Sequence, residues 1–169
     1  MTSSRVTTRL HFKTGVNEFQ DEDAIVAWAA AHAAARPGLF DLEGGVNVAC
    51  GAVQFGIGDD LTALVTQLCF VAPAAVARGE TAAFDLVNDP ETYTLRREGT
   101  EIEIAGTLIE TNRFPASALL EALVACGERY IALLGRVWAD EPGLPDLLAD
   151  LKGAAETARR ALAAAPHAG

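Results

Sequence analysis

Cysteine is scarce in this sequence, and the arrangement of the few cysteines excludes several kinds of site. There are three, Cys50, Cys69 and Cys126, which is an odd number, and none belongs to a Cys-x-x-Cys motif. Each lies in an apolar stretch, as is typical of reduced and buried cysteines in a cytosolic protein. The start of the chain, residues 1–5, lacks the apolar run of a secretory signal. We therefore expect a cytoplasmic location and no disulfide framework.

Histidine is equally scarce, and none of the three histidines lies at metal-ligand spacing from a cysteine or a second histidine. His11 alternates with basic residues along a strand-like segment, so we expect it to be exposed. The nearest approach to a phosphate-binding loop, residues 55–61, has two glycines where a dinucleotide motif needs three. No serine fits a nucleophile elbow. The sequence therefore predicts no metal site, no cofactor and no catalytic residue, and it favours a non-enzymatic role.

Basic residues are also few, since 13 Lys and Arg stand against 23 Asp and Glu, for a formal net charge of -10. Nucleic-acid affinity comes mainly from neutralising phosphates, so this charge opposes nucleic-acid binding. Anionic membrane surfaces are disfavoured by the same sign, and no apolar run is long enough to span a bilayer. A negative field attracts a basic protein. The simpler alternative is that the excess acid keeps an alanine-rich protein soluble.

Aromatic residues make up only 7% of the chain although half of it is hydrophobic. The apolar content is therefore mostly Ala, Leu and Val, which favours a core built from helix faces. A chain of 169 residues fits one domain with a self-sufficient core. We expect a single domain over residues 1–165 and a frayed tail at 166–169.

The first half of the chain predicts strands and helices in alternation. Residues 6–13 alternate strictly between apolar and polar, as in a half-buried strand. A helix is expected from the acids at 21–23 to about Ala35, and residues 46–58 are strand-like with a bulge or turn near Gly51. Asp59 and Asp60 then precede a second helix that ends at Gly79.

The clearest local signal is a β-hairpin over residues 93–104, with Glu98 and Gly99 as its two-residue turn. This turn predicts four cross-strand pairs: Leu95 with Ile102, Tyr93 with Ile104, Arg96 with Glu101, and Thr94 with Glu103. One face of the hairpin is then apolar and the other polar. Together with a strand over residues 82–87, the hairpin forms part of a meander at 82–109.

The last third of the chain is predicted to be helical, with one helix after Pro115 and another after Pro145. Gly127 lies in the apolar seam of the first, where it permits close approach of another backbone. The expected fold class is α+β. We expect a mostly antiparallel sheet of about five strands, with two or more helices on one face.

The first functional hypothesis is a non-enzymatic acidic protein-interaction module, such as an inhibitor or immunity-type protein for a basic partner protein. Its predicted partner-binding residues are the polar side of the hairpin and one aromatic at a helix end: Thr94, Arg96, Glu101, Glu103 and Trp138. Trp138 has a second interpretation, as a side chain that closes the core.

Two alternatives remain open. One is a small-molecule binding protein or a modest enzyme, with a pocket between sheet and helices lined by Trp28, Phe55, Phe84 and Tyr130. The other is a homo-oligomeric structural protein, for example a homodimer that packs through the alanine-rich last helix.

Overall fold

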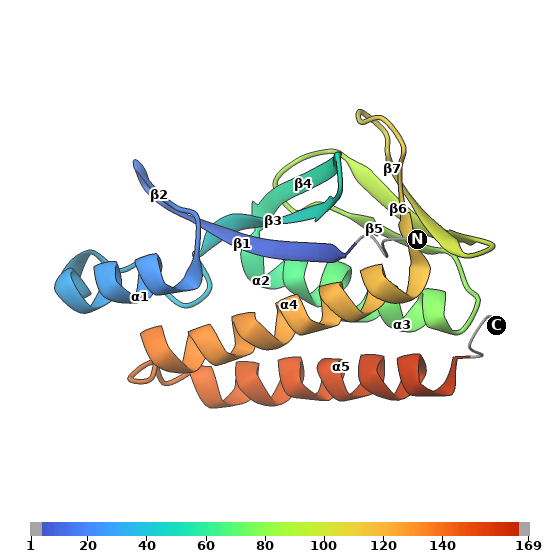
Figure 1. Cartoon of the computed structure of the whole chain (residues 1–169). Coiled ribbons are helices and arrows are strands. Elements are labelled where there is room, and N and C mark those ends of the chain that lie inside the picture. Colours follow the sequence, from blue (N-terminus) through green and yellow to red (C-terminus); the bar gives the residue numbers. More distant parts are fainter. Residues whose placement is uncertain (1–4, 166–169) are drawn as a thin grey trace.

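The computed structural model describes residues 5–165, which form two four-stranded antiparallel sheets and a group of helices (Figure 1). Buried side chains from both sheets and from the helices belong to one hydrophobic core. The expected α+β class is thus confirmed. Residues 5–165 contain eight strands in two sheets, whereas the sequence predicts about five strands in one sheet. The expected frayed tail, 166–169, lies outside the described residues.

The first sheet has the strand order β2-β1-β3-β4. Its strands are β1 (Val6–Thr14), β2 (Asn17–Phe19), β3 (Glu43–Cys50) and β4 (Val53–Asp60). The alternation predicted for the first strand is confirmed, since Leu10 and Phe12 are fully buried while Arg9 and Lys13 are exposed. The turn expected near Gly51 joins β3 to β4, and Gly51 has a positive φ of 60°.

The second sheet has the order β5-β6-β7-β8 and confirms the meander. Its strands are β5 (Ala82–Asp85), β6 (Thr92–Glu98), β7 (Glu101–Gly106) and β8 (Asn112–Pro115). Strand β8 extends the meander beyond the expected strands by pairing with β7. The inner face of this sheet is apolar and includes the buried residues Leu95, Ile102 and Phe114.

The predicted register of the hairpin is wrong by two residues. Glu98 pairs with Glu101, so the turn is Gly99 and Thr100, and none of the four expected pairs occurs. The observed pairs are Tyr93 with Gly106, Thr94 with Ala105, Leu95 with Ile104, and Arg96 with Glu103. Gly99 has a φ of 63°, which a type II′ turn requires at its first position. Because side chains alternate with a period of two, a two-residue shift leaves each residue on its expected face.

The helices are α1 (Glu22–Ala31), the 3₁₀ turn η1 (Ala33–Ala35), α2 (Leu61–Leu64), η2 (Val65–Val71), α3 (Ala72–Ala77), α4 (Ala116–Val137) and α5 (Leu144–Ala164). The side chain of Asp21 caps α1, and that of Asp60 caps α2. The first helix ends at Ala31, and η1 continues to Ala35, where the sequence predicts the end of one longer helix. The segment η2 is π-helical and joins α2 to α3 without a break.

The helices cover one face of the sheets, as expected, and leave the other face uncovered (Figure 1). Helix α4 packs against β1, η2 and the second sheet, while α5 packs on α4, η2 and α3 on the side away from the strands. We call the uncovered face of the first sheet, which carries Thr7, Arg9 and His11, its outer face. Within residues 5–165, no helix combines the length and the apolar character needed to cross a membrane.

Candidate functional site

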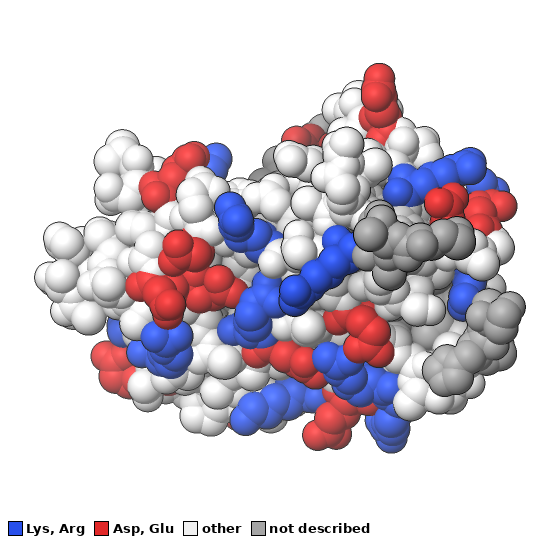
Figure 2. Space-filling view, viewed as in Figure 1, with Lys and Arg blue, Asp and Glu red and all other residues white. Residues whose placement is uncertain are grey.

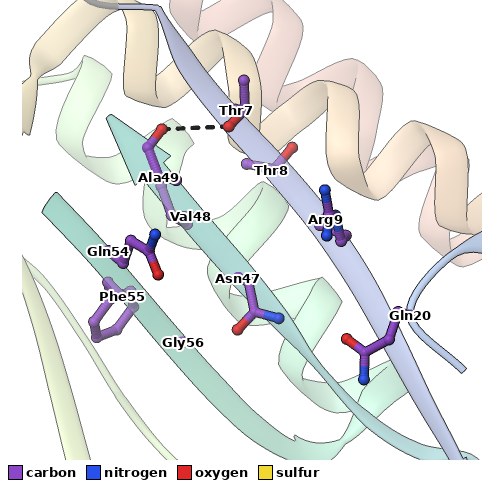
Figure 3. Close-up of a pocket in the computed structure, with 10 residues that line it drawn as sticks. All are labelled: Thr7, Thr8, Arg9, Gln20, Asn47, Val48, Ala49, Gln54, Phe55 and Gly56. Atoms are coloured by element: carbon purple, nitrogen blue, oxygen red, sulfur yellow. Dashed lines mark hydrogen bonds between the residues drawn. The ribbon is translucent and has the colours of Figure 1, made fainter. Parts of the chain in front are cut away.

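The outer face of the first sheet is hollowed into a cavity of about 570 Å³ (Figure 3). Strands β1, β3 and β4 supply its floor, and Gln20, just after β2, stands at its edge. The residues that line it are Thr7, Thr8, Arg9, Gln20, Asn47, Val48, Ala49, Gln54, Phe55 and Gly56.

The pairing of the strands explains why these side chains meet. Antiparallel neighbours on one face of a sheet form rows across the strands. Three such rows form the middle of the outer face: Thr7, Ala49 and Gln54; then Arg9, Asn47 and Gly56; then His11, Gly45 and Gly58. The hydrogen-bonding side chains therefore come from three strands that the hairpin turn at Gly51 brings into one register.

The glycines in these rows leave space above the strands, because they have no side chain on the outer face. A Cβ atom added to Gly45 would lie 2.2 Å from Cε1 of His11, and one added to Gly56 would lie 2.4 Å from Oδ1 of Asn47. The imidazole and the amide therefore lie flat over positions that any other residue would fill. The sequence reveals the glycines but not what lies over them.

His11 and Asn47 contact each other on this floor. Nδ2 of Asn47 donates to Nδ1 of His11 over 3.3 Å. Partial burial lowers the pKa of His11, and the Lys13 ammonium lowers it further, so the ring is neutral near pH 7. The expectation that His11 is exposed is therefore corrected to a partly buried side chain.

Arg9 is the only charged residue among those that line the larger cavity. Its guanidinium has no hydrogen bond or ion pair with any residue that the structure describes. This cavity thus has a positive character, although the whole chain carries a net charge of -10.

A second hollow of about 250 Å³ lies on the same face, one row beyond the first, and is acidic. It is lined by His11, Lys13, Glu43, Gly44, Gly58, Asp59, Asn88 and Asp89. From Thr7 to Lys13 the outer face spans seven residues of β1, which corresponds to roughly 20 Å of extended chain. We call the two hollows together the outer groove.

The carboxylates of the acidic hollow have different roles. Asp59 is buried, and it accepts hydrogen bonds from the backbone N–H groups of Val87 and of Asn88, the latter at 2.9 Å. Asp59 therefore holds the loop between β5 and β6 against the end of β4. Glu43 and Asp89 are exposed and have no basic partner among residues 5–165, so their charges are open to a ligand.

Acidic residues elsewhere are more often paired. Figure 2 shows acidic and basic side chains interspersed over α1, α4 and α5. Three ion pairs in this region are Arg129 with Glu22 at 2.8 Å, Arg136 with Asp23 at 3.3 Å, and Arg159 with Glu128 at 2.7 Å. Exposed pairs of this kind contribute little stability, but they cancel charge locally.

The predicted partner-binding residues of the hairpin lie together on the outer face of the second sheet, exposed or partly exposed: Thr94, Arg96, Glu101 and Glu103. Two of these residues are already paired inside the chain, since Glu103 forms ion pairs with Arg96 at 3.3 Å and with Arg113 at 2.9 Å.

Trp138, the remaining predicted contact, does not reach the surface. It is fully buried, and its Nε1 donates to the carbonyl of Pro37 over 3.0 Å. The second interpretation of Trp138, a side chain that closes the core, describes its position.

The four aromatic residues predicted to line a pocket do not meet in one place. Phe55 and Phe84 each contact Tyr93, with ring centroids 5.9 Å apart in both pairs. The buried Tyr130 bonds the Thr62 hydroxyl at 2.7 Å, and Trp28 stacks on His32 beyond β2. Of the four, only Phe55 lines the outer groove, because core side chains fill the space between the sheets and the helices.

Sequence reasoning missed Asn47, Gln54 and Gln20. The signal that could have found the first two is the turn at Gly51, since a two-residue turn there places 47 and 54 on the same face. Gln20 follows the short strand β2, which has no alternation to reveal it.

No group of three or more His, Cys, Asp or Glu side chains is placed to hold a metal ion in the part of the chain that the structure describes. Comparison of the chain with protein-family models, with curated proteins and with solved structures finds no match.

Proposed function

We propose that this chain is a non-enzymatic protein-interaction module that holds an extended segment of a basic partner protein in the outer groove. The observation that carries the proposal is the uncovered outer face of the first sheet, which is polar, hollowed and roughly 20 Å long. An inhibitor or immunity-type protein is the finer form of this function.

The walls of the larger hollow suit a polypeptide backbone. The amides of Asn47, Gln54 and Gln20 each carry a donor and an acceptor, so they can pair with peptide groups whatever side chains the segment has. The floor is low where the side chains of His11 and Asn47 lie over glycines, which lets a second backbone approach the sheet. Small-molecule pockets, in contrast, are mostly apolar and enclosed.

The charges of the acidic hollow supply the preference for a basic segment. Glu43 and Asp89 are free to pair with Lys or Arg side chains, and the net charge of -10 adds long-range attraction. Opposite charge speeds encounter and fixes the direction in which an extended segment lies.

Selection from a random peptide library displayed on phage, with the purified chain as target, tests this proposal. The selected peptides should be enriched in Lys and Arg. A synthetic peptide of that sequence should bind about tenfold more weakly to the double variant Glu43→Lys, Asp89→Lys, and the loss should shrink at high salt.

The matched control is the double variant Glu110→Lys, Asp150→Lys, which changes the net charge by the same amount at exposed positions that line neither hollow. It should bind the peptide nearly as well as the original chain does. Equal losses in both variants, or selected peptides without a basic bias, would contradict the proposal.

Binding of a small anion is a second candidate, and the position of Arg9 favours it. A lone guanidinium in a cavity whose lining residues include no acid is suited to a carboxylate or phosphate. A ligand that binds the folded chain raises its Tm by mass action. A screen of carboxylates and phosphates should therefore find a shift that the Arg9→Gln variant loses, and a screen without any shift rejects this candidate.

A further inference from the structure

Two cysteine side chains lie close together in the core. Cys69 lies on η2 and Cys126 on α4, both fully buried, and their side chains interact. Cys50, the third cysteine, lies at the end of β3 and is partly exposed. The expectation of buried cysteine thus holds for Cys69 and Cys126 but not for Cys50.

The packing of α4 against η2 explains the contact between the thiols. Gly127 follows Cys126 directly, and a Cβ atom there would lie only 3.0 Å from Cβ of Cys69. The missing side chain brings the two helical segments together at the cysteines. The π-helical turn, which is uncommon and often found at functional sites, places Cys69 in this contact.

The surroundings of the two thiols differ. Ala122, Cys126 and Arg129 follow one another at helical spacing toward β1, where the Thr8 hydroxyl donates to the Ala122 carbonyl over 3.1 Å. Arg129 donates to the Thr8 carbonyl over 2.9 Å. The polar groups around Cys126, besides the Cys69 thiol, are thus the Thr8 hydroxyl, the Arg129 guanidinium and the Glu22 carboxylate that pairs with Arg129.

These neighbours make Cys126 the more acidic of the two. The Cys69 thiol, the Arg129 guanidinium and the Thr8 hydroxyl together lower the pKa of Cys126, against the opposing effects of its burial and of the Glu22 carboxylate. The contact with Cys126 and complete burial raise the pKa of Cys69. A pair with one more acidic and one less acidic thiol can divide the roles of attacking and resolving cysteine.

A hollow of about 450 Å³ on the surface borders α4 one turn after Cys126. Strand β1, the start of α1 and helix α4 form its walls. Thr8, Glu22 and Arg129, which interact with Cys126, are among the residues that line it, whereas Cys126 itself is not. Cys126 is fully buried, so an oxidant in this hollow reaches its sulfur only when the side chains of the wall move aside.

We propose that Cys126 and Cys69 form a peroxide-reactive dithiol, in which hydrogen peroxide oxidises Cys126 and Cys69 then completes a disulfide between η2 and α4. The Cys126 thiolate attacks one peroxide oxygen, the O–O bond breaks, and the leaving hydroxide takes up a proton to become water. Cys69 next attacks the sulfur of the Cys126 sulfenic acid. The S–O bond breaks, and the second hydroxide leaves as water with the Cys69 proton. Two thiols lose two electrons, and one peroxide becomes two waters.

The test treats the reduced full chain with hydrogen peroxide, blocks remaining thiols with an alkylating agent, and analyses proteolytic peptides by mass spectrometry without reduction. A cross-linked peptide joining Cys69 to Cys126 is expected, with Cys50 alkylated. The Cys50→Ser variant should give the same cross-link. The Cys69→Ser variant should stop at a sulfenic acid on Cys126, which dimedone traps.

A kinetic arm tests the part that Arg129 plays. The Arg129→Met variant should form the disulfide several-fold more slowly, and the pH at which the rate reaches half its maximum should rise. Arg136→Met is the control, because Arg136 lines the same hollow but pairs with Asp23. Circular dichroism verifies that each variant is folded.

Three results would overturn the proposal. One is the absence of a link between Cys69 and Cys126 in folded protein that forms other oxidation products. Another is oxidation of Cys50 before Cys126. The third is an equal change in rate for Arg129→Met and Arg136→Met.

Discussion

Gly127 lies so close to Phe70 that a Cβ atom added to the glycine would be 2.3 Å from Cζ of the ring. Phe70 is fully buried, so its ring cannot move aside without displacing other core side chains. The close approach that the sequence predicts at Gly127 is thus a contact inside the chain, made by the side chains of η2.

The Gly127→Ala substitution should therefore destabilise the chain by about 1–3 kcal/mol, as over-packing of a core usually does. Gly135 lies on the same helix with nothing within 4 Å of an added Cβ, so Gly135→Ala should stabilise by about 0.5–1 kcal/mol. Urea unfolding of both variants measures the difference. Equal effects of the two substitutions would show that the contact with Phe70 carries no strain.

Removing the Asp59 carboxylate should also destabilise the fold. The Asp59→Ala variant leaves the N–H groups of Val87 and Asn88 without their acceptor, which should cost about 1–3 kcal/mol. Asp89→Ala removes an exposed carboxylate of the same hollow and should change stability by less than about 0.5 kcal/mol. Hydrogen exchange of the Val87 and Asn88 amides should become faster only in the first variant.

The turn of the second sheet provides a third prediction. Gly99 has a φ of 63°, so Gly99→Ala should destabilise the chain by about 1–2 kcal/mol. Gly99→Asn should cost less, because asparagine tolerates positive φ. Thr100→Ala is the control at the next position. If all three variants unfold at the same denaturant concentration, the turn does not have the conformation described.

Stability should depend on pH through Glu103. The Arg113 guanidinium, together with that of Arg96, lowers the pKa of Glu103 in the folded chain. A lowered folded pKa contributes stability that is complete above the unfolded value, about 4.3, and is lost as the pH falls through the folded value.

The difference in unfolding free energy between the original chain and Glu103→Gln should therefore shrink from pH 7 toward pH 3. In an Arg113→Gln background the difference should be smaller and vary less with pH. Chemical denaturation at several pH values measures it. A difference that stays constant over this range would exclude the linkage.

Much of the fold follows from local patterns, and the exceptions have physical reasons. The alternation in β1 and β6 is strict, so their buried faces could be predicted. The register of the hairpin could not be predicted from the position of the glycine, because a glycine can occupy either position of a two-residue turn. A type I′ turn would need positive φ at Glu98 as well, whereas a type II′ turn needs it only at Gly99. Turn chemistry thus favours the observed register.

The division into two sheets and the outer groove depend on contacts between distant segments. Strand β2 has only three residues, so no local pattern predicts it. No local pattern predicts, either, that β4 does not pair with β5. Asn47 and Gln54 become neighbours of Arg9 only through the pairing of β3 with its two partners. The contact between Cys69 and Cys126 is likewise invisible in a sequence that separates them widely.

The position of α4 against β1 also bears on how the chain is made. Thr8 and its partner Ala122 are 114 residues apart, so β1 leaves the ribosome long before the helix that covers its apolar side. At about 5–20 residues per second, this interval lasts roughly 6–23 s. During that time Leu10 and Phe12 have no α4 to pack against. The N-terminal sheet of the nascent chain should therefore bind chaperones. A chain whose translation is slow or stops before residue 116 should aggregate.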